Sequence, residues 1–291
     1  MTLSVIIPSR DMPCYPLVEE LHRQLTSSKV DDWEIIVADD GSDSIEAKYS
    51  FDKARQLPCV RWEVLSKSRN RGEMRNRLPG LARYEWLLEI NSNVMPVSKD
   101  FISSYVVEMQ KNVDVVCGGV TSMYIAGNLR AMDESDYAKR HSSEERNSNP
   151  FLSFRNTNVL ARKDVYSKVR YDESIREYGY EDLAFGAALK RAGMTVHYID
   201  NPVKYVLDES NATYVEKTET ALHTLSRLSA EQQSLSVLHR WAETLRCCGL
   251  SGVVVLWHYL FSTIERKSLC GHHPRLWVFR IYKLGYYLSL T

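Results

Sequence analysis

The sequence predicts an α/β protein with a mostly parallel, Rossmann-like central sheet flanked by helices, followed by a C-terminal helical extension. Short apolar runs alternate with amphipathic helical patterns over the first two hundred residues, which is typical of a doubly wound sheet. One apolar run leads directly into the acidic pair Asp39–Asp40 and a Gly-Ser turn. Strand patterns then stop near Glu216, where we place a domain boundary.

The first half of the chain supplies four strands with helices between them. We expect strands at residues 3–7, 34–38, 60–65 and 86–90, because each is a short apolar run of strand length. Helices are expected from Pro16, over 45–56 and over 71–83, and Pro79–Gly80 should break or kink the last one.

The second half continues the sheet with wider spacing. We expect strands at residues 113–120, 156–161 and 196–199, and a helix over 182–191 that ends at Gly193. Residues 127–150 are polar and read either as a mobile loop or loosely packed helix near an active-site mouth, or as a plain surface insertion. The predicted domains are 1–215, which is catalytic, and 216–291, which is helical.

Bulk properties exclude several classes of protein. Lys plus Arg and Asp plus Glu both total 37, so no net charge attracts nucleic acid. The six cysteines form no Cys-x-x-Cys pair, which favours a reduced, cytoplasmic compartment. Arg10 and Asp11 precede any long apolar stretch, and no window of 18 residues is uniformly apolar. We therefore expect neither a signal peptide nor a transmembrane helix.

The acidic pair at residues 39–40 lies where open α/β sheets bind ligands, at the carboxyl end of a strand. Carboxylates at that edge can accept hydrogen bonds from a base or a ribose, or contact a metal shell. The alternative is a solvated turn that uses Asp and Gly for turn geometry.

Four short motifs occur in order between residues 3 and 210. They are the run Ser4 to Ser9, residues 34–43, Asn70-Arg71-Gly72 with Arg75-Asn76, and Glu181-Asp182. In this order the sequence resembles glycosyltransferase family 2, nucleotide-sugar enzymes with the GT-A fold, and its tail at residues 282–287 resembles a bacterial surface-glycan branch of that family. A nucleotidyltransferase would need a Gly-x-Gly-x-x-Gly loop, which is absent.

The resemblance implies where the nucleotide-sugar donor binds. It assigns the base, usually uracil, to Asp39, whereas Asp40 more readily caps the following turn. Arg71 and Arg75 are four residues apart, so on a helix they share a face that could grip a diphosphate; the alternative is a solvated basic surface. The implied nucleotide-sugar-binding residues are Pro8, Ser9, Arg10, Asp39, Asn70, Arg71, Arg75, Asn91, Ser92 and Asn93.

The resemblance also implies the catalytic residues. Inverting sugar transfer needs a carboxylate that takes the proton from the acceptor hydroxyl, a step typically worth about 10²–10⁴-fold in rate. We assign that role to Asp182 and a contact with sugar or acceptor to Glu181. The alternative is that Asp182 only caps a helix.

The metal motif of the family is altered in this sequence. The Asp-x-Asp pattern is replaced by Asn91-Ser92-Asn93, and no His occurs near residues 203–207. An amide oxygen can ligate Mn²⁺ or Mg²⁺ but brings no charge, so Asn93 is at best a weak metal ligand. Arg71, Arg75 and Lys204 could stabilise the leaving group instead. The remaining alternative is a catalytically weak or inactive glycosyltransferase-like scaffold subunit.

Residues 239–291 combine seven Lys or Arg with two acids and many aromatic side chains. Such a composition suits the headgroup layer of a bacterial inner membrane, or else a helical pair packed on the catalytic domain or another subunit. We therefore expect an inverting glycosyltransferase in the cytoplasm, peripheral at the inner membrane. It would transfer sugar from a UDP-sugar to a glycan or lipid-linked acceptor.

Overall fold

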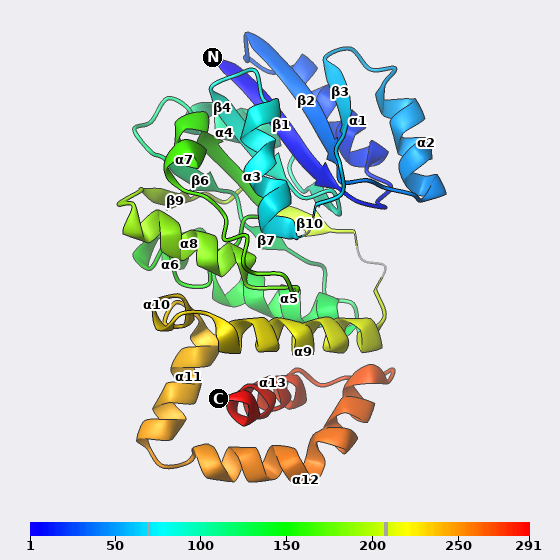
Figure 1. Cartoon of the computed structure of the whole chain (residues 1–291). Coiled ribbons are helices and arrows are strands. Elements are labelled where there is room, and N and C mark those ends of the chain that lie inside the picture. Colours follow the sequence, from blue (N-terminus) through cyan, green and yellow to red (C-terminus); the bar gives the residue numbers. More distant parts are fainter. Residues whose placement is uncertain (69, 207–208) are drawn as a thin grey trace.

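The computed structural model describes residues 1–68, 70–206 and 209–291 (Figure 1). Its main sheet has seven strands in the described residues: β1 (Thr2–Ser9), β2 (Asp32–Asp39), β3 (Val60–Val64), β4 (Trp86–Ile90), β6 (Val115–Cys117), β8 (Asn158–Arg162) and β9 (Val196–Tyr198). They are ordered β3-β2-β1-β4-β8-β6-β9, and β8 alone runs antiparallel to its neighbours. The predicted, mostly parallel sheet is confirmed.

A second, three-stranded sheet consists of β5 (Val94–Pro96), β10 (Val203–Tyr205) and β7 (Val120–Thr121). The single strand predicted at 113–120 is wrong, because it divides into β6 and β7 in different sheets. Gly118 and Gly119 cause the division. A Cβ on Gly118 would lie 2.4 Å from the Asn201 carbonyl oxygen, and Gly119 adopts a φ of +84°, which glycine tolerates best.

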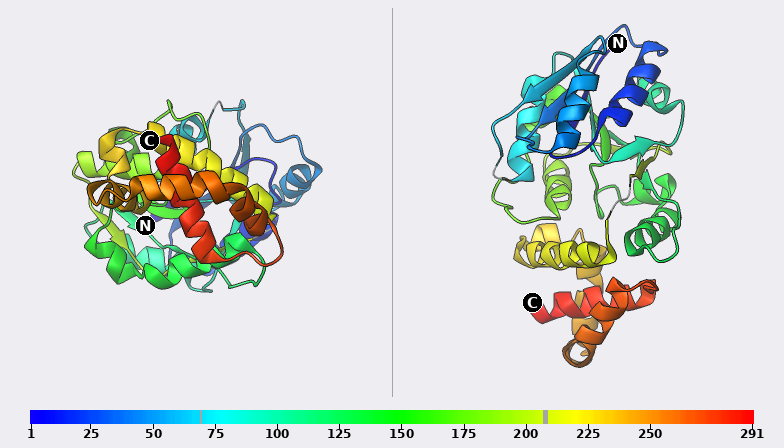
Figure 2. Two further views of the ribbon diagram at one scale, coloured as in Figure 1. Left: turned by 90° about the horizontal axis from the view of Figure 1, so that it is seen from below. Right: turned by 90° about the vertical axis from the view of Figure 1, so that its right-hand side faces the viewer.

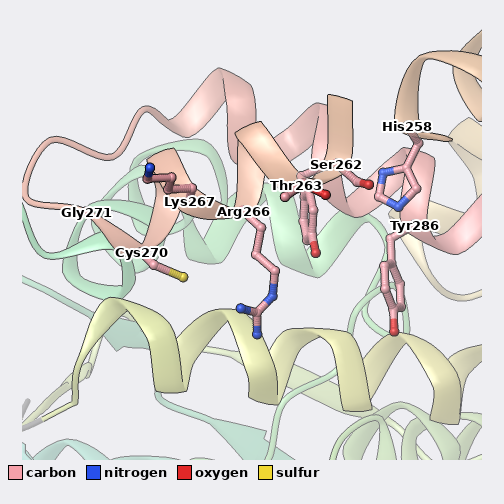
Figure 3. A pocket seen from close by; sticks show the side chains of 9 residues that line it. His258, Ser262, Thr263, Arg266, Lys267, Cys270, Gly271 and Tyr286 are labelled. Atoms are coloured by element: carbon pink, nitrogen blue, oxygen red, sulfur yellow. The ribbon is translucent and has the colours of Figure 1, made fainter. Parts of the chain in front are cut away.

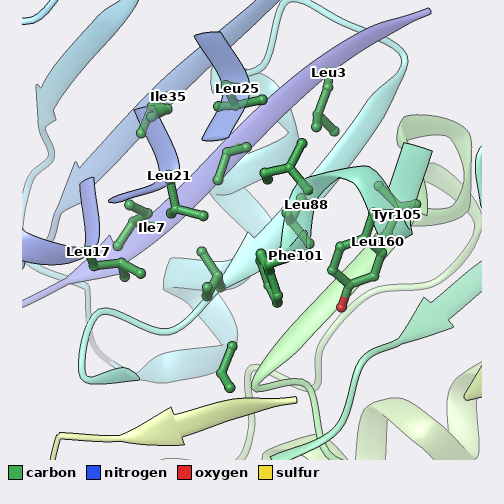
Figure 4. Packing of buried hydrophobic residues seen from close by; sticks show 14 of the residues in the cluster. Leu3, Ile7, Leu17, Leu21, Leu25, Ile35, Leu88, Phe101, Tyr105 and Leu160 are labelled. Carbon is green, nitrogen blue, oxygen red and sulfur yellow. The ribbon is translucent and has the colours of Figure 1, made fainter. Parts of the chain in front are cut away.

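Helices cover both faces of the main sheet. α1 (Tyr15–Thr26), α2 (Ile45–Ala54) and α4 (Phe101–Glu108) pack on one face, and α3 (Arg71–Leu81), α7 (Lys163–Lys168) and α8 (Glu181–Arg191) on the other (Figure 1). Along β1, Val5 and Ile7 face the first layer and Ile6 the second, as the period of two requires. Figure 4 shows the core of the first layer. α3 continues through Pro79 and ends at Leu81, so Pro79 lies in its last turn.

The polar stretch at residues 127–150 forms α5 (Leu129–Arg140) and α6 (Ser143–Ser148). Asn128 caps α5 by accepting a hydrogen bond from the Ala131 N–H at 2.9 Å. Leu129 and Met132 on α5 are buried. Of the predicted alternatives, the helix near an active-site mouth agrees with the structure, because α5 lines the main cleft; the mobile loop and the plain surface insertion are wrong, and α5 is packed rather than loose.

The C-terminal helices are α9 (Asn211–Arg227), α10 (Ala230–Gln233), α11 (Val237–Cys247), α12 (Ser251–Cys270) and α13 (Leu276–Leu290). The boundary predicted at residue 216 falls inside α9, so the helical region begins at Asn211. α9 lies beside the sheet-containing part, α12 lies farthest from it, and α13 lies between them (Figures 1 and 2). In the described residues no single helix meets the length and hydropathy of a membrane span; α11 and α12 do so only jointly, across a bend of 114°.

Candidate active site

A cleft of about 970 Å³ opens at the carboxyl edge of the main sheet. Strand ends, the N-termini of α3 and α8, and the loop after β4 form its floor, whereas α5, α9 and α13 close it. All but one of the predicted site residues line it: Pro8, Ser9, Arg10, Asn70, Arg71, Arg75, Asn91, Ser92, Asn93, Glu181 and Asp182. The exception is Asp39. Residues that are up to 174 positions apart in sequence thus share one cavity.

The two acids after β2 lie in different surroundings. Asp39 holds the turn, because its Oδ1 accepts the Ser42 N–H at 2.8 Å and its Oδ2 accepts the Trp62 indole N–H at 3.0 Å. Asp40 lines the cleft instead, with Oδ1 accepting the Ser68 N–H at 2.6 Å. Of the two acids, Asp40 lines the cleft, whereas Asp39, to which the base was assigned, does not; which of them binds a base stays a prediction.

Arg71 and Arg75 of α3 line the cleft, whereas Arg77 of the same helix donates to Ser66 outside it. Asn70 caps the helix by accepting the Glu73 N–H at 2.8 Å. Arg71 donates to Glu181 Oε1 at 2.8 Å and lies 4.6 Å from the centre of the Tyr178 ring. Its side chain remains 58% exposed, so it can still meet a ligand. The alternative of a solvated basic surface is wrong for Arg75, which is buried, but not for the exposed part of Arg71.

Arg75 is buried and fixed on several sides. It forms an ion pair with Glu89 on β4 and donates to the Asn91 Oδ1 at 3.1 Å. Its guanidinium also lies 5.6 Å from the centre of the Tyr171 ring. A buried Arg–Glu pair is costly unless both charges are well partnered, and here the partners hold the cation at the cleft floor.

The loop after β4 offers poor metal ligands. Asn91 and Asn93 supply neutral amide oxygens, and that of Asn91 already accepts the hydrogen bond from Arg75. The described part of the chain contains no group of three or more His, Cys, Asp or Glu side chains that could hold a metal ion. This donor set does not fit a tightly bound divalent cation. Lys204, which was considered above as a cation for the leaving group, does not line the cleft. Leu207, the last residue of the segment that lacks a histidine, lies outside the described residues.

Glu181 and Asp182 enter the cleft from the first turn of α8. The preceding turn has Gly179 at φ +99° and Tyr180 at φ +61°. A Cβ on Gly179 would lie 2.5 Å from the Cβ of Ala221 on α9, so only glycine fits there. The residue that caps α8 is Tyr180, and the alternative role of Asp182 as the helix cap is therefore wrong.

The two adjacent carboxyl groups have opposite pKa shifts. Burial raises the pKa of Asp182 to about 6, and the neighbouring charge of Glu181 adds to the rise. Burial also opposes ionisation of Glu181, but Arg71 outweighs it and leaves the pKa of that carboxyl below its ordinary value. Asp182 accepts the Asn156 N–H at 3.3 Å through Oδ2, while its buried Oδ1 has no partner. Groups with divergent pKa values in one cleft mark acid–base sites.

Sequence reasoning missed the wall opposite α3. There Arg155 lies 3.8 Å from the centre of the Tyr137 ring and pairs with Glu134 at 2.6 Å. Arg130 lies 4.5 Å from the centre of the Tyr205 ring. These residues come from α5, β10 and a loop, and no short motif links them. Aromatic faces beside fixed polar groups are typical of small-molecule sites.

Solved structures with a similar fold come from several glycosyltransferases. The mannosyltransferase PcManGT from Pyrobaculum calidifontis, in complex with GDP-Man and Mn²⁺, has a TM-score of 0.59 at 11% identity, over 99% of this chain and 85% of that one. S. aureus TarS 1–349 in complex with UDP-GlcNAc has a TM-score of 0.50 at 15% identity, over 81% and 69% of the two chains. Mannosyl-3-phosphoglycerate synthase from Rubrobacter xylanophilus has a TM-score of 0.50 at 14% identity, over 79% and 77%. At these identities the likeness shows the GT-A fold.

Sequence comparison gives the family. No curated protein matches the chain. The profile described as Glycosyl transferase family 2 matches residues 4–169, a range that contains the ends of β1 and β2, the N-terminus of α3 and the loop after β4. This range exceeds half of the chain. The chain therefore belongs to glycosyltransferase family 2 and is a glycosyltransferase with the GT-A fold.

Proposed function

We propose that this glycosyltransferase is inverting and moves a sugar from a UDP-sugar to a hydroxyl of a glycan or lipid-linked acceptor. The observation that carries the proposal is Asp182. Its Oδ1 has no partner, its pKa is raised to about 6 by burial, and it shares one cleft with Asp40 and Arg71. A carboxylate that is ionised at neutral pH and has a free oxygen is suited to accept a proton from an alcohol.

The proposed reaction is a single displacement. Asp182 takes the proton of the acceptor hydroxyl as its oxygen forms a bond to the anomeric carbon. The bond from that carbon to the diphosphate oxygen breaks on the opposite face, and UDP leaves with the electron pair. Arg71 lies at the same end of the cleft and is exposed, so it can bind the charge that develops on the diphosphate. Because the donor set does not fit a divalent cation, we assign no step to one.

Recognition of the base is assigned to Asp40. A carboxylate can accept the imide N–H of uracil, which cytosine lacks. TarS is described with UDP-GlcNAc and PcManGT with GDP-Man, so both bases are represented among proteins of this fold. Calorimetric titration with UDP, GDP and CDP tests the choice. We expect UDP to bind more tightly than GDP or CDP. Asp40→Asn should lower the affinity for UDP by roughly tenfold, as the loss of one charged hydrogen bond does. Tighter binding of GDP would contradict the UDP assignment.

We also propose that the enzyme acts in the cytoplasm, as a peripheral protein at the inner membrane. The basic and aromatic composition of residues 239–291 supports this location. A surface-bound enzyme would meet a lipid-linked acceptor in two dimensions rather than three.

The decisive experiment is transfer or donor hydrolysis with a set of UDP-sugars, comparing the wild type with Asp182→Asn. We expect the variant to lose at least about 10²-fold in kcat while still binding UDP. Proton NMR of the first product should show an anomeric configuration opposite to that of the donor. Equal activity of the variant would remove Asp182 from the mechanism, and retained configuration would exclude single displacement.

A further inference from the structure

α12 has its apolar side turned outward. Six large apolar side chains follow one another along the outer side of this helix at spacings of one, three and four residues, and we call them the α12 stripe. All six are exposed, and Leu256, Leu260 and Ile264 are 58–66% exposed. Spacings of three and four place side chains on one face of a helix. The α12 stripe consists of Val253, Leu256, Trp257, Leu260, Phe261 and Ile264.

The inner side of α12 combines apolar residues, among them the buried Leu269, with polar ones. His258 and Glu265 are buried there, and Arg266 donates to Glu219 on α9 at 2.8 Å. At the edge of this side the Trp257 indole N–H donates to Glu265 Oε1 at 2.8 Å. Figure 3 shows Arg266 and Tyr286 pointing toward α9, with His258 beside Tyr286, around a cavity of about 540 Å³. A helix on the surface of a protein in water usually has polar residues on its outer side, whereas α12 has large apolar residues there.

The neighbouring helices also expose large aromatic side chains. Trp241 on α11 is 61% exposed and Trp277 on α13 is 56% exposed. Six exposed apolar side chains on one face of α12 differ from the scattered exposure found on most proteins and mark an interaction site.

The charge that borders the stripe on α12 is positive. Lys267 follows Ile264 by three residues and continues the line of the stripe. Arg240 on α11 and Arg275 before α13 are also exposed, and the exposed acid on α11, Glu243, is paired with Arg246. Lys267, Arg240 and Arg275 pair with no carboxylate among the described residues. The only acid on α12 is Glu265, and it is buried. The surface thus offers apolar and cationic groups without an exposed anion from α12.

We propose that the α12 stripe inserts into the boundary between headgroups and acyl chains of an anionic lipid bilayer, with Lys267 contacting lipid phosphates. This deepens the peripheral location proposed above, because it names the helix and its orientation. Amphipathic elements with Trp and Leu on one side and cations at the edge bind membranes in this way. α12 lies at the end of the molecule farthest from the sheet (Figure 2), so the cleft would stay outside the lipid.

A second copy of the chain is a poorer occupant. A two-fold dimer brings the same patch of each subunit together. Lys267 at the edge of the stripe would then meet the stripe of the other copy without an exposed acid from α12 to pair with.

The test is co-sedimentation of the full chain with vesicles of phosphatidylcholine alone or mixed with phosphatidylglycerol. We expect binding to the mixed vesicles, weaker binding to neutral ones, and a blue shift of tryptophan fluorescence on binding. Leu256→Gln/Leu260→Gln should weaken binding by roughly tenfold or more, since two apolar side chains no longer enter lipid. Ile45→Gln/Val64→Gln is the matched control, because both residues are exposed apolar side chains far from α12, and it should bind like the wild type.

Two results would overturn the proposal. One is equal binding of the α12 variant and the wild type, or no vesicle binding at all. The other is a dimer, seen by sedimentation velocity, that dissociates in the α12 variant while vesicles remain unbound; this assigns the stripe to a second copy. The Asp182→Asn variant should bind vesicles like the wild type, so a failed transfer assay and a failed membrane assay are separate outcomes.

Discussion

Glu181 and Asp182 are adjacent in sequence but differ in what surrounds them. Arg71 pairs with Glu181 and keeps its pKa below the ordinary value, whereas burial and the Glu181 charge raise the pKa of Asp182. The first turn of α8 places both in the cleft, where the helix dipole favours negative charge. Position on the helix therefore does not distinguish them, and their different partners do.

The raised pKa of Asp182 predicts how activity depends on pH. Only the ionised carboxylate can accept a proton, so kcat/KM should fall as pH drops through about 6, by about tenfold per pH unit below it. The measurement is kcat/KM for transfer between pH 4.5 and 8, with stability checked at each pH. A profile that stays flat down to pH 5 would argue against Asp182 as the base.

The same shift predicts a stability effect of Asp182→Asn. The folded pKa of about 6 exceeds the ordinary 3.8, so ionisation is disfavoured in the folded state. The stability contributed by the protonated form is complete below about pH 4 and is lost as pH rises through 6. The neutral Asn variant should therefore be more stable than the wild type at pH 8, by about 2–3 kcal/mol. Urea unfolding at pH 8 and pH 4 measures this, and the gain should shrink at the lower pH.

Asn91 and Asn93 predict how the nucleotide site responds to metal. Wild-type affinity for UDP should change little when Mn²⁺ is added, because the two amides bring no charge and Asn91 is bonded to Arg75. Asn91→Asp/Asn93→Asp should bind UDP at least about tenfold tighter with Mn²⁺ than without it. Calorimetric titration of both proteins, with EDTA as the metal-free condition, decides between these outcomes. If Mn²⁺ strongly raised the affinity of the wild type for UDP, the amide oxygens would be shown to be adequate metal ligands.

At the scale of elements, the turn before α8 fixes the catalytic acids. Gly179 combines a φ of +99° with contact against Ala221 on α9, whereas Gly193 at the other end of α8 has a φ of +68° and open space around it. Gly179→Ala should cost about 2–4 kcal/mol of stability and lower kcat, since both backbone strain and a clash displace the turn. Gly193→Ala should cost only about 1 kcal/mol and leave kcat unchanged. Urea unfolding and transfer assays compare the two variants.

Strands were predictable where the sequence carries an apolar run of strand length. β1, β2 and β4 are buried on both faces and read as apolar runs. β5, β7 and β10 have two or three residues each, too few for a period of two to be visible. Which of Asp39 and Asp40 lines the cleft was also beyond prediction. Adjacent residues at a strand end point to opposite sides, and the sequence alone does not say which side holds the ligand.

At the scale of the molecule, the closure of the cleft depends on contacts between distant segments. Tyr214 and Lys217 on α9 and Lys283 on α13 line the same cavity as Pro8. The sequence predicted residues 216–291 as a separate domain, because the change from strand patterns to helical patterns is visible there. Which side of the sheet those helices cover is decided by tertiary packing, and no local pattern encodes it.

A cleft lined by both parts predicts that ligand binding stabilises the whole chain. A ligand that binds only the folded protein adds about 2.7 kcal/mol at a hundredfold excess over its Kd, which is roughly 5 °C in Tm for a chain of this length. With a saturating UDP-sugar we expect one thermal transition that moves upward, measured by calorimetry. Hydrogen exchange should slow in α3, α8 and α9 together, because all three contribute to the cleft wall.

Hydrogen exchange in α12 distinguishes protection around the cleft from a general stiffening of the protein. α12 contributes no residue to the cleft, and its outer stripe is exposed, so its exchange should change less than that of α9. Two transitions, of which the ligand moves only the one assigned to residues 1–206, would show instead that the C-terminal helices unfold independently of the site. In that case α9 would cover the cleft without contributing binding energy, and acceptor contacts would have to come from α5 and the loops of the sheet.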